Sequence, residues 1–189
     1  MKILVINGHP DEKSYVSALF NEYLKNINEE SHTIKTLELG KMKYDPVLRY
    51  GYRKRMEDDP EIIMSQNYIR WADHIVIFYP IWFETVPSLL KGWFERVLTP
   101  GVAYDMDGYK ISKYLKGKTA HLISTSLSPI IIQIIRGDIE LKSVKRVLQF
   151  CGIKVYKVDR LGHYVVGKYE SAQKRKKFLN KIAMAAQSL

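Results

Sequence analysis

Short apolar runs alternate with segments of helical periodicity along the whole chain. Lys2–Asn7 and residues 74–79 are almost continuously apolar, which is typical of strands that are buried on both faces. Residues 33–39, 118–126 and 155–161 predict three further strands. Because such strands need cover on both sides, the pattern indicates a parallel sheet with helices packed against each face.

Segments with apolar residues at helical spacing follow these strands. Ser14 is suited to cap a first helix, and Asp59-Pro60-Glu61 predicts a second helix with proline in its first turn. Three more helices are predicted at residues 86–98, 141–150 and 171–186. Residues 40–59 are polar, basic and rich in turn formers, which indicates a long connection.

Each of the five predicted strands precedes a helix or a connection that contains one. This alternation predicts one doubly wound α/β domain over residues 1–189, with its strands in the order 2-1-3-4-5. Ligands of such sheets bind beyond the carboxyl ends of the strands, where the strand order reverses. The expected site therefore lies at residues 8–17, 80–84 and 125–129, which follow strands 1, 3 and 4.

The first of these segments, GHPDEKSYVS, leads into the first helix. It matches neither GxGxxG nor GxxxxGK(S/T), which disfavours a Rossmann dinucleotide site and a P-loop. The free amides at the helix start, the Ser14 hydroxyl and the His9 imidazole can surround a phosphate instead. An ordinary capped helix beside a surface histidine is the alternative interpretation.

The second segment offers apolar and aromatic side chains at the same edge. Ile81, Trp82 and Phe83 suit the flat, partly apolar face of an isoalloxazine ring, and backbone amides there can bond its polar edge. Trp82 and Phe83 can also pack against a neighbouring subunit. The two interpretations are compatible.

Composition narrows the classes of partner. Lys and Arg number 30 against 20 Asp and Glu, which gives a net charge of +10. The basic residues are spread along the chain without interleaved aromatic residues, so we expect no binding of nucleic acid. We expect a solvated basic surface with a modest attraction for the phosphates of NAD(P)H. No His, Asp and Glu residues have metal-ligand spacing, and we expect no metal.

Other features bear on the compartment. Cys151 is the single cysteine, which excludes an intrachain disulfide, and its apolar flanks predict buried packing. No apolar run approaches the roughly 20 residues that span a bilayer. The first apolar run ends in Gly-His-Pro-Asp and lacks a small-residue cleavage site, so we expect a cytoplasmic protein.

Four stretches resemble one known family: GHPDEKSYVSAL, IRWADHIVIFYPIWFETVPSLLKGWFERVLTPGVAY, GKTAHLISTSLSPIII and VLQFCGIK. They are similar to the NAD(P)H dehydrogenase (quinone) family, the flavodoxin-like group that contains DT-diaphorase and bacterial FMN-dependent quinone reductases. The likeness covers nearly the whole chain. It implies a homodimer with a flavodoxin-like fold and a bound flavin, FMN or alternatively FAD. It also implies ping-pong transfer of two electrons from NAD(P)H to a quinone-like acceptor.

The resemblance also implies roles for individual residues. The flavin phosphate and ribityl chain would be held by His9, Ser14, Tyr15, Val16 and Ser17. The ring would be contacted on one side by Pro80, Ile81, Trp82 and Phe83, and at its other edge by Thr125 and Ser126. Val16 stands where relatives often have asparagine, so it is expected to contribute only its amide.

This chain departs from the family pattern near the acceptor. The tyrosine that some relatives use to steady charge is absent, and Ile130 to Ile132 stand where relatives have aromatic residues. We expect these isoleucines to form an aliphatic acceptor pocket without a hydrogen-bond donor. Tyr104 and His163 are the candidate catalytic substitutes, together with Arg136.

Two other functions fit the same sequence. One is an FMN electron carrier, although such carriers usually meet basic partners and this chain is itself strongly basic. The other is a flavin-binding regulatory subunit attached to a membrane transporter, as some relatives are. Membrane recruitment would distinguish that second alternative from an independent reductase.

Overall fold

Five parallel strands form the centre of the computed structural model, which describes residues 1–54, 56–163 and 169–189. These strands are β1 (Lys2–Asn7), β2 (Thr33–Glu38), β3 (His74–Pro80), β6 (Thr119–Thr125) and β7 (Lys154–Leu161). They pair in the order β2-β1-β3-β6-β7, which confirms the predicted doubly wound sheet. All seven residues of β3 are buried, as their continuous apolar sequence requires for a central strand.

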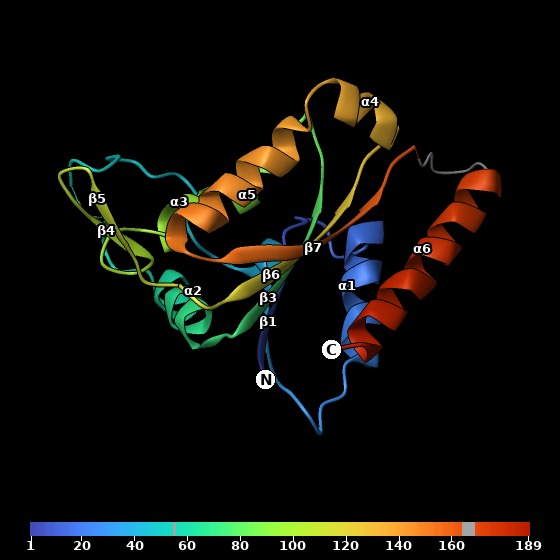
Figure 1. Cartoon of the computed structure of the whole chain (residues 1–189), viewed down its shortest axis with the longest axis horizontal. Coiled ribbons are helices and arrows are strands. Elements are labelled where there is room, and N and C mark those ends of the chain that lie inside the picture. The colour runs from blue at the N-terminus through green and yellow to red at the C-terminus, as the bar shows by residue number, and fades with distance from the viewer. Residues whose placement is uncertain (55, 164–168) are drawn as a thin grey trace.

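Helices cover both faces of this sheet (Figure 1). One face carries α1 (Tyr15–Asn26) and α6 (Tyr169–Gln187), and the other carries α2 (Pro60–Trp71), α3 (Ser88–Val97) and α5 (Ile139–Cys151). Alternate residues of each strand point to opposite faces. In β1, Ile3 and Val5 pack with α1 and α6, whereas Leu4 and Ile6 pack with the other three helices. The core therefore lies in two layers.

The predicted helix starts are confirmed by their caps. Ser14 precedes α1, and its side chain accepts a hydrogen bond from the Ser17 amide. Asp59 caps α2 in the same way, and Pro60 occupies the first helical position. Cys151 ends α5 with 1% of its surface exposed, which confirms its expected burial.

Four elements lie outside the predicted pattern. A short 3-10 turn, η1 (Leu39–Lys41), follows β2, and a short helix, α4 (Ile130–Ile135), follows β6. An antiparallel hairpin of β4 (Tyr104–Asp107) and β5 (Lys110–Lys113) projects from the sheet (Figure 1). The Asp107-Gly108 pair, with Gly108 at φ 57°, is the local signal that could have predicted this hairpin.

Within the described residues, no helix combines the length and the apolar character needed to cross a bilayer.

Candidate functional site

Three loops leave the sheet side by side at the carboxyl ends of β1, β3 and β6. Backbone hydrogen bonds continue the sheet pairing past the strands: Gly8 N donates to Phe78 O at 2.7 Å, and Ile81 N donates to Thr125 O at 2.7 Å. The structure thus brings together the three segments that the sequence predicted. The first loop also packs closely against η1, because a Cβ on Gly40 would collide with the Pro10 carbonyl.

The first loop is built on a chain of internal hydrogen bonds. Asn7 Nδ2 donates to Ser17 Oγ at 2.9 Å, and that hydroxyl donates to Asp11 O at 2.9 Å. Ser14 Oγ accepts from the Ser17 amide at 3.1 Å and lies 3.0 Å from Ser17 Oγ. Because the Ser17 hydrogen goes to Asp11, Ser14 is the donor between the two hydroxyls.

His9 presents its Nε2–H outward from this loop. Its Nδ1 accepts a hydrogen bond from the Asp11 amide at 2.9 Å, so the neutral ring carries its proton on Nε2. Burial lowers the pKa of His9, against the opposing effect of Asp11. The ring meets Trp82 edge to face, with 5.4 Å between centroids, which couples the first loop to the second.

The residues expected at the phosphate differ in what they can offer. Among the described contacts, no hydrogen bond occupies the Val16 amide, which lies in the first turn of α1. Ser17 has 1% of its surface exposed, and its amide and hydroxyl form hydrogen bonds within the loop. Ser17 therefore stabilises the loop and does not present its hydroxyl to a ligand. The Tyr15 hydroxyl donates to Arg175 O at 2.7 Å and so points toward α6.

The second loop is a tight turn that exposes an aromatic side chain. Trp82 and Thr85 exchange backbone hydrogen bonds of 2.9 and 3.0 Å. Between them, Phe83 and Glu84 have φ values of 49° and 60°, the left-handed pair of a type I′ turn. Such turns favour Asn and Gly, so two larger residues here carry backbone strain. Phe83 is fully exposed.

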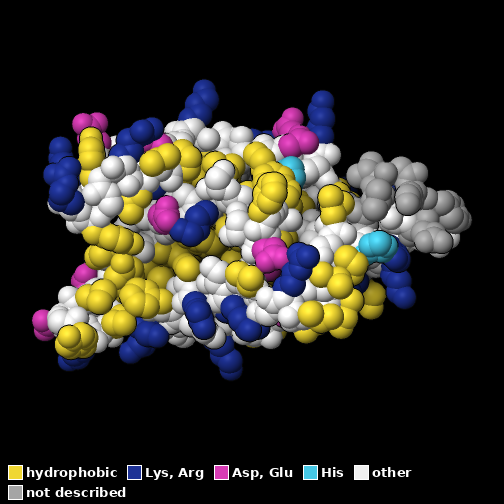
Figure 2. Space-filling model, turned by 90° about the horizontal axis from the view of Figure 1, so that it is seen from above, with side chains coloured by type: hydrophobic (Ala, Val, Ile, Leu, Met, Phe, Trp, Pro, Cys, Tyr) yellow, Lys and Arg dark blue, Asp and Glu magenta, His cyan; other side chains and the backbone are white. Residues whose placement is uncertain are grey.

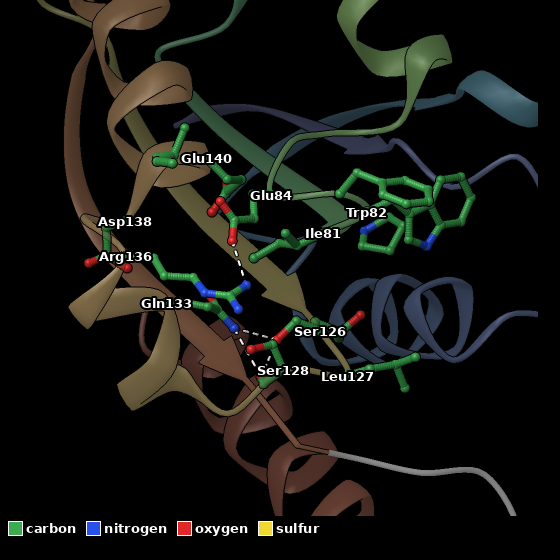
Figure 3. Close-up of a pocket in the computed structure, with 14 residues that line it drawn as sticks. Ile81, Trp82, Glu84, Ser126, Leu127, Ser128, Gln133, Arg136, Asp138 and Glu140 are labelled. Atoms are coloured by element: carbon green, nitrogen blue, oxygen red, sulfur yellow. Dashed lines mark hydrogen bonds and ion pairs between the residues drawn. The ribbon is translucent and has the colours of Figure 1, made fainter.

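A cavity of about 400 Å³ lies between the second loop, the third loop and the start of α5. Its lining is formed by Pro80, Ile81, Trp82, Phe83, Glu84, Thr125, Ser126, Leu127, Ser128, Gln133, Arg136, Asp138, Ile139 and Glu140. Gln133, Arg136, Asp138 and Glu140 occupy one side and Trp82 the other (Figure 3). The cavity thus combines an apolar and aromatic wall with a polar one.

Hydrogen bonds and ion pairs order the polar wall. Gln133 Nε2 donates to Ser126 Oγ at 2.5 Å and to Ser128 O at 3.1 Å. Arg136 pairs with Glu84 across 2.7 Å, and both side chains remain substantially exposed (Figure 3). This ion pair joins the loop after α4 to the strained turn after β3, and it lies on the cavity lining.

Two buried polar atoms on the lining have no hydrogen-bond partner in the described part of the chain. They are Thr125 Oγ1 and Glu140 Oε1, in residues with 1% and 4% of their surface exposed. A buried polar atom is normally bonded, and leaving it unbonded costs about 1–3 kcal/mol. Such atoms on a cavity wall therefore favour a ligand that completes them.

The tentative catalytic residues do not line this cavity. Tyr104 is buried in the β4–β5 hairpin with its ring edge to face against Phe150, and burial raises its pKa to about 12. Within one chain Tyr104 is therefore a packing residue. His163 is exposed, and its amide donates to Ser128 O at 3.2 Å. It therefore contacts the backbone of the third loop and is not part of the cavity lining.

The expected aliphatic acceptor pocket is not observed. Ile130 to Ile132 start α4 and are absent from the lining, whereas Gln133 of the same helix turns toward Ser126. Sequence reasoning missed Gln133, Asp138 and Glu140. Gln133 inside the apolar run IIIQII was the available signal, but α4 itself was not predicted. Asp138 and Glu140 lie in a polar stretch and gave no such signal.

The residues present fit a flavin. The loop of β1 offers the Val16 amide and His9 Nε2–H at a helix start, where an anion is stabilised. The cavity begins at Trp82, which the His9 ring contacts, and its lining has an aromatic wall and the unbonded hydroxyl of Thr125. A flat ring with polar edges joined to a phosphate matches this donor set. Within the described residues, no three His, Cys, Asp or Glu side chains are grouped as a metal site.

Sequence comparison defines the class to which this fold and site belong. The model of a family described by its flavodoxin-like fold matches residues 1–185, and the chain belongs to that family. The mouse ribosyldihydronicotinamide dehydrogenase (quinone) is 28% identical over 146 residues, which cover 66% of this chain and 63% of the mouse protein. The match therefore spans less than two thirds of that relative. Guinea-pig NAD(P)H dehydrogenase (quinone) 1 is 26% identical over 180 residues, covering 82% of this chain and 66% of its own.

Solved structures agree with this assignment. Smu.1420 from Streptococcus mutans superposes with a TM-score of 0.85 at 27% identity, over 100% of both chains. The FMN-dependent NADH-azoreductase of Bacillus anthracis, solved with FMN, has a TM-score of 0.73 at 19% identity over 99% of this chain and 98% of its own. The second likeness is a likeness of fold alone.

Proposed function

We propose that this protein is a flavin-dependent NAD(P)H oxidoreductase that reduces quinone-like acceptors. The observation that carries the proposal is the cavity at the carboxyl ends of β3 and β6, with its aromatic wall and its unbonded buried oxygens. Two named relatives of this family are quinone dehydrogenases, which supports a quinone-like acceptor.

FMN is the proposed flavin, with FAD as the alternative. His9 Nε2–H, the Val16 amide and the start of α1 would hold its phosphate, with Ser14 shaping the loop. Pro80 to Phe83 would contact the ring, and Thr125 and Ser126 would meet its other edge. We favour FMN because the phosphate loop is compact and the described residues offer no evident segment for an adenosine.

When bound, the flavin supplies the hydride chemistry. The chain supplies binding and orientation: the apolar wall excludes water, and the polar wall fixes which edge of a planar substrate enters. NAD(P)H and the acceptor would use the same open face in turn, since one cavity of about 400 Å³ adjoins the turn. Sharing one face leads to ping-pong kinetics.

A homodimer would complete this site. Trp82 and Phe83 are exposed beside the cavity, and Met106 and Tyr109 are exposed on the β4–β5 hairpin. Apolar side chains gather in and around a hollow on the face above the strand ends (Figure 2). A second copy would remove these surfaces from water, and it would provide the missing wall over the flavin.

The test is spectroscopic. Purified protein should be yellow, and chromatography of the heat-released flavin should identify FMN. Anaerobic NADH or NADPH should bleach the flavin absorbance, and a quinone should then restore it. A colourless protein that takes up neither FMN nor FAD would overturn the proposal. A flavoprotein that NAD(P)H does not bleach would instead be an electron carrier or a regulatory subunit of a membrane transporter.

A further inference from the structure

The carboxyl group of Glu140 is a buried acid on the cavity wall, and no ion pair with another described residue neutralises it. The residue has 4% of its surface exposed, lines the cavity, and has Oε1 without a hydrogen-bond partner among the described residues. Burying an isolated carboxylate is strongly unfavourable, so such a group holds its proton. An unbonded, protonated carboxyl facing a cavity is able to donate to a ligand there.

The groups packed around Glu140 support a neutral acid. From β3 the buried Tyr79 hydroxyl approaches the Glu140 carboxyl as a hydrogen-bonding neighbour, and from β6 the buried Ser124 hydroxyl approaches Tyr79. From β7, Arg160 is already paired with Asp138 at 2.6 Å. Burial raises the pKa of Glu140 and Asp138 adds to this, while Tyr79, Arg160 and Lys145 oppose it.

Other donors on the same lining are less suited to release a proton. The Ser126 hydroxyl already donates to Ser128 O at 2.8 Å, and Arg136 is paired with Glu84. Thr125 has an unbonded hydroxyl, which can donate a hydrogen bond, but an alcohol is far too weak an acid to give up its proton. A carboxyl whose pKa burial raises above its usual range is better matched to the task.

We propose that Glu140 donates the proton that converts a quinone to its hydroquinone, an inference that rests on the proposed function. Reduction of a quinone takes one hydride equivalent and one proton. NAD(P)H provides the hydride equivalent through the flavin. The O–H bond of Glu140 breaks, a new O–H bond forms on the quinone oxygen, and Glu140 is left as a carboxylate. After the hydroquinone leaves, the carboxylate regains a proton from water.

This assignment names the acceptor chemistry more closely. The acceptor is a planar ring that carries a carbonyl oxygen and would stack on the open face of the bound flavin, with that oxygen directed to Glu140. The sequence predicted an acceptor pocket without a hydrogen-bond donor. The proposal differs from that prediction because its donor, Glu140, lies on α5 and not on α4. Acceptors that take electrons without protons gain nothing from Glu140.

The experiment separates the two half-reactions in stopped flow with the flavin-loaded protein. In Glu140→Gln, bleaching by NAD(P)H should stay within about twofold of wild type, because that step consumes no proton from the wall. Reoxidation by a benzoquinone should slow about 100-fold and lose its solvent deuterium isotope effect. Reoxidation by ferricyanide, which takes no proton, should be unchanged. Glu95→Gln, at a partly exposed position on α3 where the side chain pairs with Lys91, is the matched control.

A second readout does not depend on turnover. Infrared difference spectra of the oxidised holoprotein, with and without a quinone, should show a protonated-carboxyl band that shifts on binding and is missing in Glu140→Gln. If the variant fails to fold, the spectrum of wild type alone still tests the proposal. Absence of the protonated-carboxyl band from wild type at neutral pH overturns the proposal. Equal quinone rates in wild type and Glu140→Gln also overturn it, while normal bleaching leaves the proposed function intact. Failure of NAD(P)H to bleach wild type would overturn the proposed function itself.

Discussion

Replacing Ser14 by aspartate separates folding of the first loop from binding of a phosphate. Ser14 Oγ accepts the Ser17 amide at 3.1 Å and donates to Ser17 Oγ at 3.0 Å. Aspartate keeps the cap but loses the donated hydrogen bond, a loss of about 1 kcal/mol. Its negative charge at the start of α1 stabilises the helix by about 0.3–1 kcal/mol. The free energy of unfolding of the apoprotein should therefore change by less than about 1 kcal/mol.

Binding of FMN should respond much more strongly. Its phosphate carries a charge of roughly −1.5 to −2 at neutral pH. Two unit charges about 4 Å apart repel by about 1 kcal/mol where water screens them, so the carboxylate should weaken binding by about 2 kcal/mol. Since about 1.4 kcal/mol is a tenfold change, the Kd for FMN should rise between about tenfold and thirtyfold.

Fluorescence titration of the apoprotein measures this Kd, and urea unfolding measures the stability. Riboflavin, which lacks the phosphate, should bind wild type and Ser14→Asp equally. Glu12→Ala is the control variant, because Glu12 is exposed and makes only a 3.7 Å surface pair with Lys41. The reasoning fails if Glu12→Ala weakens FMN as much as Ser14→Asp does, or if riboflavin is weakened alongside FMN.

Three further predictions follow from the geometry. Phe83→Asn should raise the free energy of unfolding, measured in urea, by about 0.5–1 kcal/mol, because asparagine tolerates the positive φ. If the variant is instead less stable than wild type, and more so at low protein concentration, Phe83 packs in a dimer. Burial, helped by His121 and His32, lowers the pKa of His74 to about 4, so only the unfolded state binds this proton as pH falls below 6.5. Stability should then drop by roughly 2–3 kcal/mol between pH 6.5 and 4, and His74→Gln should flatten this drop in urea titrations at several pH values. Gly40→Ala should displace the Pro10 carbonyl and weaken FMN binding at least about tenfold, with little change in far-UV circular dichroism. Unchanged FMN affinity would show that η1 does not hold the phosphate loop.

Much of the fold follows from local patterns. Continuous apolar runs are enough to identify β1 and β3, because a strand buried on both faces tolerates few polar residues. Ser14 and Pro60 mark helix starts for reasons that act within a few residues. Strict alternation of strands and helices then leads to the parallel sheet and to the edge where ligands bind. These grounds alone predict that the three loops after β1, β3 and β6 lie together at the site.

The polar wall of the cavity was decided only by tertiary structure. Gln133, Arg136 and Glu140 come from α4, its following loop and α5. They line one cavity with Glu84, which Arg136 contacts, only because β6 lies beside β3 in the sheet. In the sequence Glu140 looks like any acidic residue in the first turn of a helix. Its burial, its unbonded oxygen and its position opposite Trp82 arise from packing between segments more than fifty residues apart. Hydrophobic pattern reports which face of an element is covered, whereas the chemistry of a buried acid depends on which side chains the fold leaves beside it.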